Sequence, residues 1–242
     1  MSIEDQQEWL ATPLGAYLQA QEQLLFDNAV SDVFGFNALQ LGMLEMDLLR
    51  NSRIPFSFKA DLNQGAVRCD SSQLPFLTNS IDLLLLPHAL EFSSSPHQTL
   101  REAERVLMPE GHIMITGFNP ISAWGLKRLG AKRDGYPWNG RFLTLLRIKD
   151  WLELLGFEMV TARMACYPPP FSNPAWLNRF QFMEKSGDRW WPMMGGIYFV
   201  VAKKRVLGMR LIRPNWNKSK LKPSLVPAPS QKNDHQKKQH EQ

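Results

Sequence analysis

The chain has 242 residues, a length typical of one large domain or two small ones. Hydrophobic residues make up 44% and charged residues 21% of it, which excludes a mainly disordered, collagen-like or disulfide-scaffold protein. The formal net charge of +5 would indicate an anionic partner, such as nucleic acid or an acidic membrane surface, only if that charge were spread over the fold.

The positive charge is concentrated at the carboxyl end. Residues 203–242 hold eleven basic and two acidic residues, a net +9, whereas residues 1–202 hold 17 basic and 21 acidic residues, a net −4. From about Ser219 the chain is rich in Lys, Pro, Ser and Gln and poor in large apolar side chains. We therefore expect a basic tail over 207–242, disordered from about residue 219, with weak contact to polyanions.

Two cysteines, Cys69 and Cys166, are too few for a disulfide framework or a metal cluster, which indicates a protein of the reducing cytoplasm without a metal. No apolar run approaches the roughly 20 residues that a bilayer crossing needs. The first ten residues are acidic and polar, unlike a signal peptide. We expect a cytoplasmic protein without a membrane span; the sequence contains no indication of its oligomeric state.

The amino-terminal part predicts a helical segment over 1–35. Thr12 followed by Pro13 is typical of a helix start, and apolar residues then recur at helical spacing. Strands are predicted at 37–41, 55–60 and 66–70, and a helix at 43–49. The second and third strands are only a few residues apart, whereas parallel strands normally need a crossover of about a dozen residues. One helix between them is therefore reduced or missing.

The rest of the chain alternates between strand and helix patterns. Residues 81–86 are almost continuously apolar, as in a central strand covered on both faces. Ser95, with Gln98 three residues later, predicts a helix start. The remaining elements are expected as a strand at 112–116, helices at 121–129 and 148–155, and strands at 157–163 and 197–202. This order predicts an α/β fold, a doubly wound, mostly parallel sheet, over residues 36–206.

Five linked segments carry a resemblance to a known family. In chain order they are Asp70–Phe76, Asn79–Leu84, Leu90–Phe92, Leu100–Leu107 and Pro109–Gly111. In this order they resemble the class I S-adenosylmethionine-dependent methyltransferases, in particular the type 11 branch, which is ubiquinone/menaquinone-methyltransferase-like. The resemblance covers about residues 37–202. It implies a Rossmann-like methyltransferase fold with S-adenosylmethionine as the cofactor and a small-molecule acceptor.

The resemblance also implies a set of cofactor-binding residues. Gly42 follows the first strand, where the family's backbone approaches the methionine part of the cofactor. Asp61, after the second strand, would hold the ribose hydroxyls. Asp70 would receive the adenine amino group, with Leu74 as an apolar neighbour of the ring. His88 follows the central strand, where the family lines the methyl-transfer site, and it is the candidate for a catalytic base.

Structural alternatives stand beside these roles. The sequence around Asp70, Asp-Ser-Ser, is also typical of a turn. A lone histidine at a strand end, such as His88, is more often a structural residue. Leu44 and Met46 stand where the family has further glycines, so they should either clash with a cofactor or send the loop along another path. This degenerate glycine motif supports an alternative function, a catalytically inactive methyltransferase-like binding or scaffold protein.

An insertion rich in Trp, Phe and Met lies between the last two predicted strands, at residues 167–194. We interpret it either as a lid or acceptor pocket for an apolar or ring-shaped molecule, or as a loop that packs on its own side chains. The sequence thus favours methyl transfer to an unidentified acceptor of this kind. A nucleic-acid modifier recruited by the basic tail is a further alternative.

Overall fold

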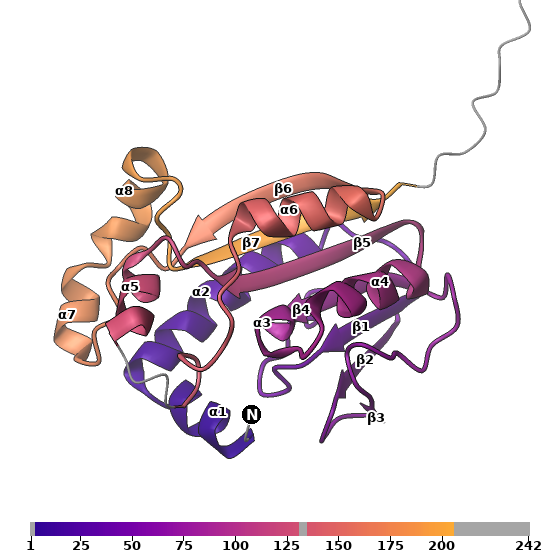
Figure 1. Cartoon of the computed structure of the whole chain (residues 1–242), viewed down its shortest axis with the longest axis horizontal. Coiled ribbons are helices and arrows are strands. Elements are labelled where there is room, and N and C mark those ends of the chain that lie inside the picture. The colour runs from indigo at the N-terminus through magenta and orange to yellow at the C-terminus, as the bar shows by residue number, and fades with distance from the viewer. Residues whose placement is uncertain (1–2, 131–134, 206–242) are drawn as a thin grey trace, which may run out of the picture. The chain divides into compact units, whose positions relative to one another are not determined.

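A computed structural model of the chain describes residues 3–130 and 135–205. By its internal contacts, the chain from Met1 to Val206 forms one unit. The predicted basic tail over 207–242 lies outside the described residues. The amino-terminal helical segment belongs to the same unit as the predicted sheet (Figure 1).

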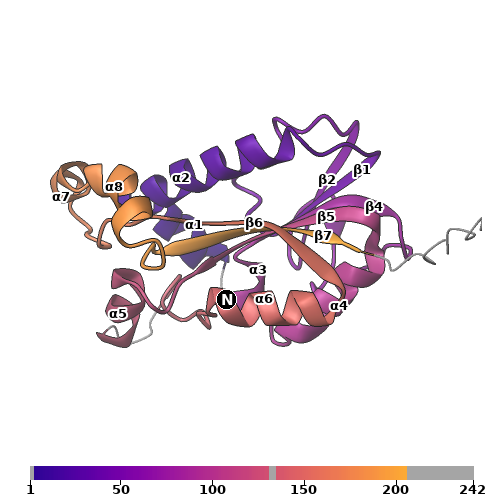
Figure 2. The same cartoon turned by 90° about the horizontal axis from the view of Figure 1, so that it is seen from above.

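Seven strands in the described residues form one sheet (Figures 1 and 2). They are β1 (Asn37–Leu41), β2 (Phe56–Asp61), β3 (Val67–Arg68), β4 (Ile81–Pro87), β5 (Leu107–Phe118), β6 (Phe157–Ala165) and β7 (Ile197–Lys204). Their spatial order is β3-β2-β1-β4-β5-β7-β6, and neighbours are parallel except where β7 pairs with β5 and β6. The predicted α/β fold with a mostly parallel sheet is confirmed.

Helices cover both faces of this sheet. They are α1 (Ile3–Leu10), α2 (Pro13–Val30), α3 (Ala89–Phe92), α4 (Pro96–Val106), α5 (Ala123–Gly130), α6 (Leu145–Leu154), α7 (Pro174–Arg179) and α8 (Phe182–Trp190). Figure 2 shows α2 on one face and α4 and α6 on the other. The short helices α3, α7 and α8 were not predicted from the sequence. No helix in the described residues combines the length and the apolar character that crossing a membrane requires.

Each face of the sheet has its own core. On the α2 face, the Phe26 ring packs edge-on against Phe199 of β7, with ring centroids 5.1 Å apart. On the other face, Leu100 of α4 and Leu152 of α6 belong to the same buried cluster as Leu84 of β4. Because β4 is covered on both sides, its sequence is apolar almost throughout.

The start of α2 confirms the predicted cap. Thr12 has an extended backbone and its Oγ1 accepts a hydrogen bond from the Gly15 N–H at 3.1 Å, while Pro13 occupies the first turn. The hydroxyl thus satisfies one of the amide groups that a helix start leaves without an intrahelical partner.

Residues 43–49, predicted as a helix, form turns instead. The reason is the buried amide side chain of Gln40 in β1. Its Nε2 donates to three carbonyl oxygens of the loop that follows, and its Oε1 accepts from the Leu48 N–H. With positive φ at Gly42 (+88°) and Met43 (+50°), the chain turns around Gln40 and cannot enter a helix.

The link between β2 and β3 is as short as the sequence indicates. Residues 62–66, all of them described, contain no helix, and the two strands pair in parallel through Ala60 with Val67 and Asp61 with Arg68. The Ala66 N–H donates to the Lys59 carbonyl at 2.9 Å. Because β3 is only two residues long, a short loop is enough to return the chain.

Candidate active site

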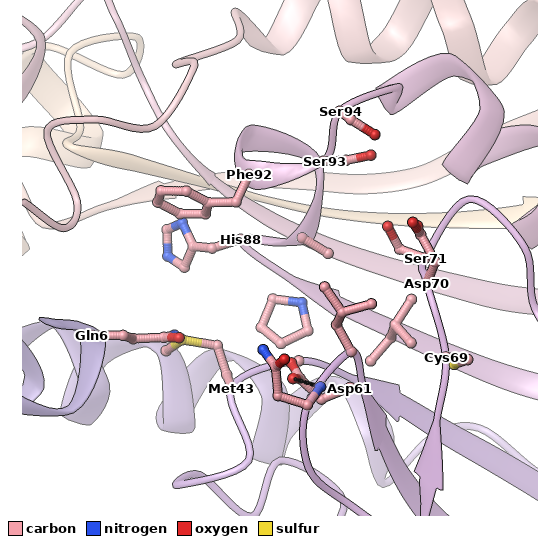
Figure 3. A pocket seen from close by; sticks show the side chains of 16 residues that line it. Gln6, Met43, Asp61, Cys69, Asp70, Ser71, His88, Phe92, Ser93 and Ser94 are labelled. Carbon is pink, nitrogen blue, oxygen red and sulfur yellow. Dashed lines mark hydrogen bonds between the residues drawn. The ribbon is translucent and has the colours of Figure 1, made fainter. Parts of the chain in front are cut away.

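A cleft of about 280 Å³ lies at the carboxyl ends of β1, β2 and β4 (Figure 3). The chain order of the strands reverses here, because β2 and β3 lie on one side of β1 whereas β4 and β5 lie on the other. In a doubly wound sheet such a switch point is where ligands bind. Gly42, Asp61, Asp70 and His88, four of the five predicted site residues, line the cleft.

Gly42 directly follows β1, with a φ of +88° that favours glycine. Its N–H donates to the Ala60 carbonyl at 2.9 Å. A Cβ at this position would lie 3.9 Å from the Pro87 carbonyl oxygen and 4.0 Å from Asp61 Oδ2, which is ordinary contact. The backbone conformation, rather than lack of space, is therefore what calls for glycine between the ends of β2 and β4.

The side chains that replace the family's further glycines do not line the cleft. Met46 is buried in the core of the α2 face, and Leu44 is half-buried along a separate surface hollow. Met43 lines the cleft instead, and its Sδ accepts a hydrogen bond from Gln6 Nε2 of α1 at 2.8 Å (Figure 3). Neither Leu44 nor Met46 therefore fills the cleft beside Gly42.

Two carboxylates line the cleft on the side of β2 and β3. Asp61 Oδ1 accepts from the Asn63 N–H at 3.0 Å, and Asp70 Oδ1 accepts from both the N–H and the hydroxyl of Ser72, at 2.8 and 2.9 Å. Asp70 therefore does cap a turn, and it lines the cleft as well. Burial, and then the charges of Asp61 and Asp70, raise the pKa of the Cys69 thiol beside them. An ionised carboxylate has room for further hydrogen bonds, so both can also accept from a ligand.

Leu74, the fifth predicted residue, is buried in the core and does not line the cleft. Its N–H donates to Glu102 Oε2 at 3.0 Å, and its carbonyl accepts from Arg105 Nη2 at 2.9 Å. Arg105 also donates to the Phe76 carbonyl and pairs with Glu102. These contacts fasten the segment after β3 to α4, which fixes the position of the cleft wall.

His88 is buried between two carboxylates. Its Nε2 lies 2.7 Å from Glu22 Oε1 of α2, and its Nδ1 lies 2.7 Å from Glu91 Oε2 of α3. Burial alone would lower the pKa of His88, but the two carboxylates outweigh it and raise the pKa to about 10. Burial raises the pKa of Glu91. Glu22 accepts no aligned hydrogen bond from the described residues, so its contact with His88 is an ion pair.

The surroundings of His88 hold it in this place. Its φ is +49°, its N–H donates to the Thr116 carbonyl at 3.1 Å, and its ring packs on Phe118, with centroids 4.2 Å apart. Glu91 also accepts the Phe118 N–H. Since both nitrogens of an imidazolium here face carboxylates, neither is free to accept a proton at neutral pH. This geometry favours the structural interpretation of His88 over a free catalytic base.

Known proteins similar to this chain share its fold and sequence pattern. A family model described as Methyltransferase domain, of the type 11 group, matches residues 36–115. The uncharacterized protein YafS of Escherichia coli K12 is 33% identical over 224 residues, which cover 88% of this chain and 86% of that protein. A SAM-dependent methyltransferase structure from Thermotoga maritima covers 84% of this chain and 96% of its own, with a TM-score of 0.60 at 15% identity. The chain belongs to the class I S-adenosylmethionine-dependent methyltransferases of type 11.

A more distant relative is similar to this chain over only part of its sequence. The malonyl-[acyl-carrier protein] O-methyltransferase of Methylovorus sp. is 29% identical over 120 residues, which cover 50% of this chain but only 40% of that protein. The chain therefore spans less than half the length of that relative, and the similarity carries no acceptor with it.

The lining of the cleft suits S-adenosylmethionine, the cofactor of this methyltransferase family. The cofactor presents ribose hydroxyls and an adenine amino group, which are hydrogen-bond donors, and a flexible methionine part. The cleft presents the carboxylates of Asp61 and Asp70 as acceptors, and at Gly42 a backbone without a side chain. The donor and acceptor sets therefore match.

Among the lining residues that the sequence did not single out are Gln6, Met43 and Phe92. Phe92 belongs to one of the segments that carry the family resemblance, so the sequence could have indicated it. Its ring stacks on Tyr136, with centroids 5.1 Å apart. Gln6 and Met43 had no such signal. Gln6 reaches the cleft only because α1 packs there, and Met43 only because the loop after β1 turns.

Part of the aromatic insertion packs on its own rings. No described side chain of residues 167–194 lines the cleft. The rings of Phe171 and Trp176 both stack on Phe180, with centroids 5.7 and 5.9 Å away. Three rings of the insertion thus form a stack of their own, outside the cleft.

Proposed function

We propose that this methyltransferase binds S-adenosylmethionine in the cleft through Gly42, Asp61 and Asp70 and methylates an apolar or ring-shaped small molecule. One observation carries the proposal: side chains from separate segments of the chain meet at the switch point of the sheet. When bound, the cofactor supplies an electrophilic methyl group on a sulfonium. The protein then has to hold it, orient the acceptor and exclude water.

Asp61 and Asp70 are proposed to hold the nucleoside part. Asp61 would accept hydrogen bonds from the ribose hydroxyls, and Asp70 from the adenine amino group. Asp61 Oδ2 lies 4.0 Å from where a Gly42 Cβ would stand, so the carboxylate and the side-chain-free backbone face the same space. The Asn63 N–H and the Ser72 groups fix the orientation of the two carboxylates before any ligand binds.

The acceptor is proposed to lie at the other side of the cleft. Figure 3 shows Gln6, Met43, His88 and Phe92 there, opposite Cys69 and Asp70. The Phe92 ring and the Met43 thioether favour an apolar or flat molecule. In-line attack on an activated methyl group needs no dedicated general base, which is consistent with a His88 that is held between two carboxylates.

Binding of S-adenosylhomocysteine, measured by titration calorimetry, tests the cofactor site. We expect Asp61→Asn to weaken binding by about tenfold or more, because hydrogen bonds to a charged acceptor contribute roughly 1.5–3 kcal/mol. The matched control is Asp32→Asn, at an exposed position at the end of α2. Absence of binding by the wild type, or equal binding by Asp61→Asn, would refute the assignment.

Transfer of a labelled methyl group from S-adenosylmethionine tests the activity. The acceptor panel contains hydroxylated aromatic rings. It also contains carboxylic acids, because one relative is a malonyl-[acyl-carrier protein] O-methyltransferase. Product in the ring class supports the proposal. A chain that binds S-adenosylhomocysteine but methylates nothing in the panel supports the inactive binding or scaffold alternative.

The further alternative, a nucleic-acid modifier recruited by the basic tail, predicts that deleting residues 219–242 abolishes binding to polyanions.

A further inference from the structure

Seven large apolar side chains are exposed on α7, α8 and the adjoining segments. They are Phe171, Trp176, Phe182, Trp190, Trp191, Met193 and Met194, and together they are called the aromatic patch. Trp190 is 70% exposed and Phe182 is 61% exposed. Single exposed apolar residues are ordinary, but so many large ones within 24 residues of sequence mark an interaction surface.

The patch lies at the same edge of the sheet as the cleft. β5 and β6 both run antiparallel to β7, so β6 points in the same direction as β4 and β5. Because α7 and α8 follow β6, they lie beyond the carboxyl ends of the parallel strands, where the cleft also opens. Figures 1 and 2 show both helices near α5, which follows the carboxyl end of β5.

The charges around the patch suit an anionic partner. Arg179 and Arg189 are exposed, and the Arg179 guanidinium lies 5.9 Å from the centre of the Trp176 ring. Glu184, by contrast, is turned inward and accepts a hydrogen bond from the Tyr17 hydroxyl. Residues 171–194 hold three basic and two acidic residues, although residues 1–202 as a whole carry a net −4. This segment is therefore slightly positive, whereas residues 1–202 as a whole are acidic.

We propose that the aromatic patch docks this methyltransferase on a lipid bilayer that contains anionic lipid. Tryptophan and phenylalanine side chains insert at the boundary between headgroups and acyl chains, and neighbouring arginines pair with lipid phosphates. The helices α7 and α8 have six and nine residues, too short to cross a bilayer but sufficient to lie in its interface. The proposal goes beyond the proposed function and does not depend on it.

The composition of the patch favours lipid over nucleic acid. Binding to a polyanion such as RNA depends on the number of phosphates that basic side chains neutralise, and Arg179 and Arg189 are the exposed basic side chains described beside the patch. Most of its surface is instead apolar, including two methionines, which gain free energy from leaving water whatever the partner's sequence. A bilayer at this edge would also present apolar molecules beside the cleft.

Co-sedimentation of the full chain with vesicles tests the proposal. The vesicles contain equal parts of phosphatidylcholine and phosphatidylglycerol, in buffer with about 0.5 M salt, so that the charges of the basic tail are screened. We expect the wild type to bind, with a shift of its tryptophan emission to shorter wavelength. The double variant W190S/W191S should bind about tenfold more weakly or worse. Both positions are exposed, and F182S serves as a second variant should the double variant not fold.

The matched control carries L77S and L154S. These leucines are 81% and 85% exposed, and they precede β4 and β6, at the opposite edge of the sheet. The control should bind vesicles as the wild type does. The proposal is overturned if W190S/W191S and F182S bind vesicles like the wild type, or if the wild type does not bind them. Self-association or RNA binding through Trp190 without vesicle binding would equally overturn it.

Discussion

Replacing His88 by Asn should remove the cation from the buried cluster that joins α2, β4 and α3. Asparagine tolerates the positive φ at this position, so the change acts on charge more than on the backbone. Glu22 and Glu91 would then be left without the imidazolium in a space where both side chains are fully buried. Breaking a buried ion pair costs about 3–5 kcal/mol, and we expect the free energy of unfolding at about pH 7 to fall by this amount.

The raised pKa of His88 sets the pH dependence of this effect. The two carboxylates raise the pKa from 6.5 to about 10 in the folded state, so the protonated imidazolium stabilises the fold. Because the folded-state pKa lies above the unfolded one, this contribution is complete below about pH 6.5 and is lost as the pH rises towards 10. The stability difference between the wild type and His88→Asn should therefore be largest near pH 6 and shrink steadily towards pH 10.

Urea unfolding followed by circular dichroism, at about pH 6.5 and about pH 9.5, measures both effects. Thermal unfolding at about pH 7 should show a midpoint lowered by roughly 6–20 °C. His97→Asn is the control, since His97 is exposed on α4. A loss below about 1 kcal/mol at pH 6.5, or a difference that does not change with pH, would refute the idea that an imidazolium balances the two carboxylates.

Three further outcomes follow from the same structure. Gly42→Ala should lower the free energy of unfolding by about 1 kcal/mol or more, because φ is +88° there, and chemical denaturation will show whether it does. The Cys69 thiol, with its raised pKa, should react slowly with iodoacetamide, and more slowly still with S-adenosylhomocysteine present; an unchanged rate would count against a cofactor in the cleft. Thr12→Ala should cost about 1 kcal/mol and Thr12→Ser much less, as thermal unfolding can measure, since the hydroxyl caps α2.

Local patterns in the sequence were sufficient for the architecture. The apolar run at 81–86 predicts a strand buried on both faces, and Thr12 with Pro13 predicts the start of α2; the structure confirms both. These features depend on residues that are neighbours in the chain, so the sequence displays them directly. The motif segments likewise indicated the family. Gly42, Asp61 and Asp70 follow three successive predicted strands, and all three do line one cleft.

The course of the loop after β1 depends on the burial of Gln40, which is decided by the packing of β1 inside the sheet. Residues 43–49 have a helix-compatible pattern, yet the buried Gln40 amide captures their backbone, and a satisfied buried amide outweighs local propensity. For the same reason the sequence could not show that Leu44 and Met46 point away from the cleft while Met43 lines it.

The charged neighbours of His88 could not be predicted from the sequence either. Glu91 is three residues away in the chain, but Glu22 comes from α2, 66 residues earlier, and only the packing of that helix on the sheet brings it to 2.7 Å. The sequence by itself determined that this protein has a doubly wound methyltransferase fold and which strands end at its cleft. The tertiary structure decided which side chains are buried together, because the charge state and contacts of a group depend on neighbours that chain order does not reveal.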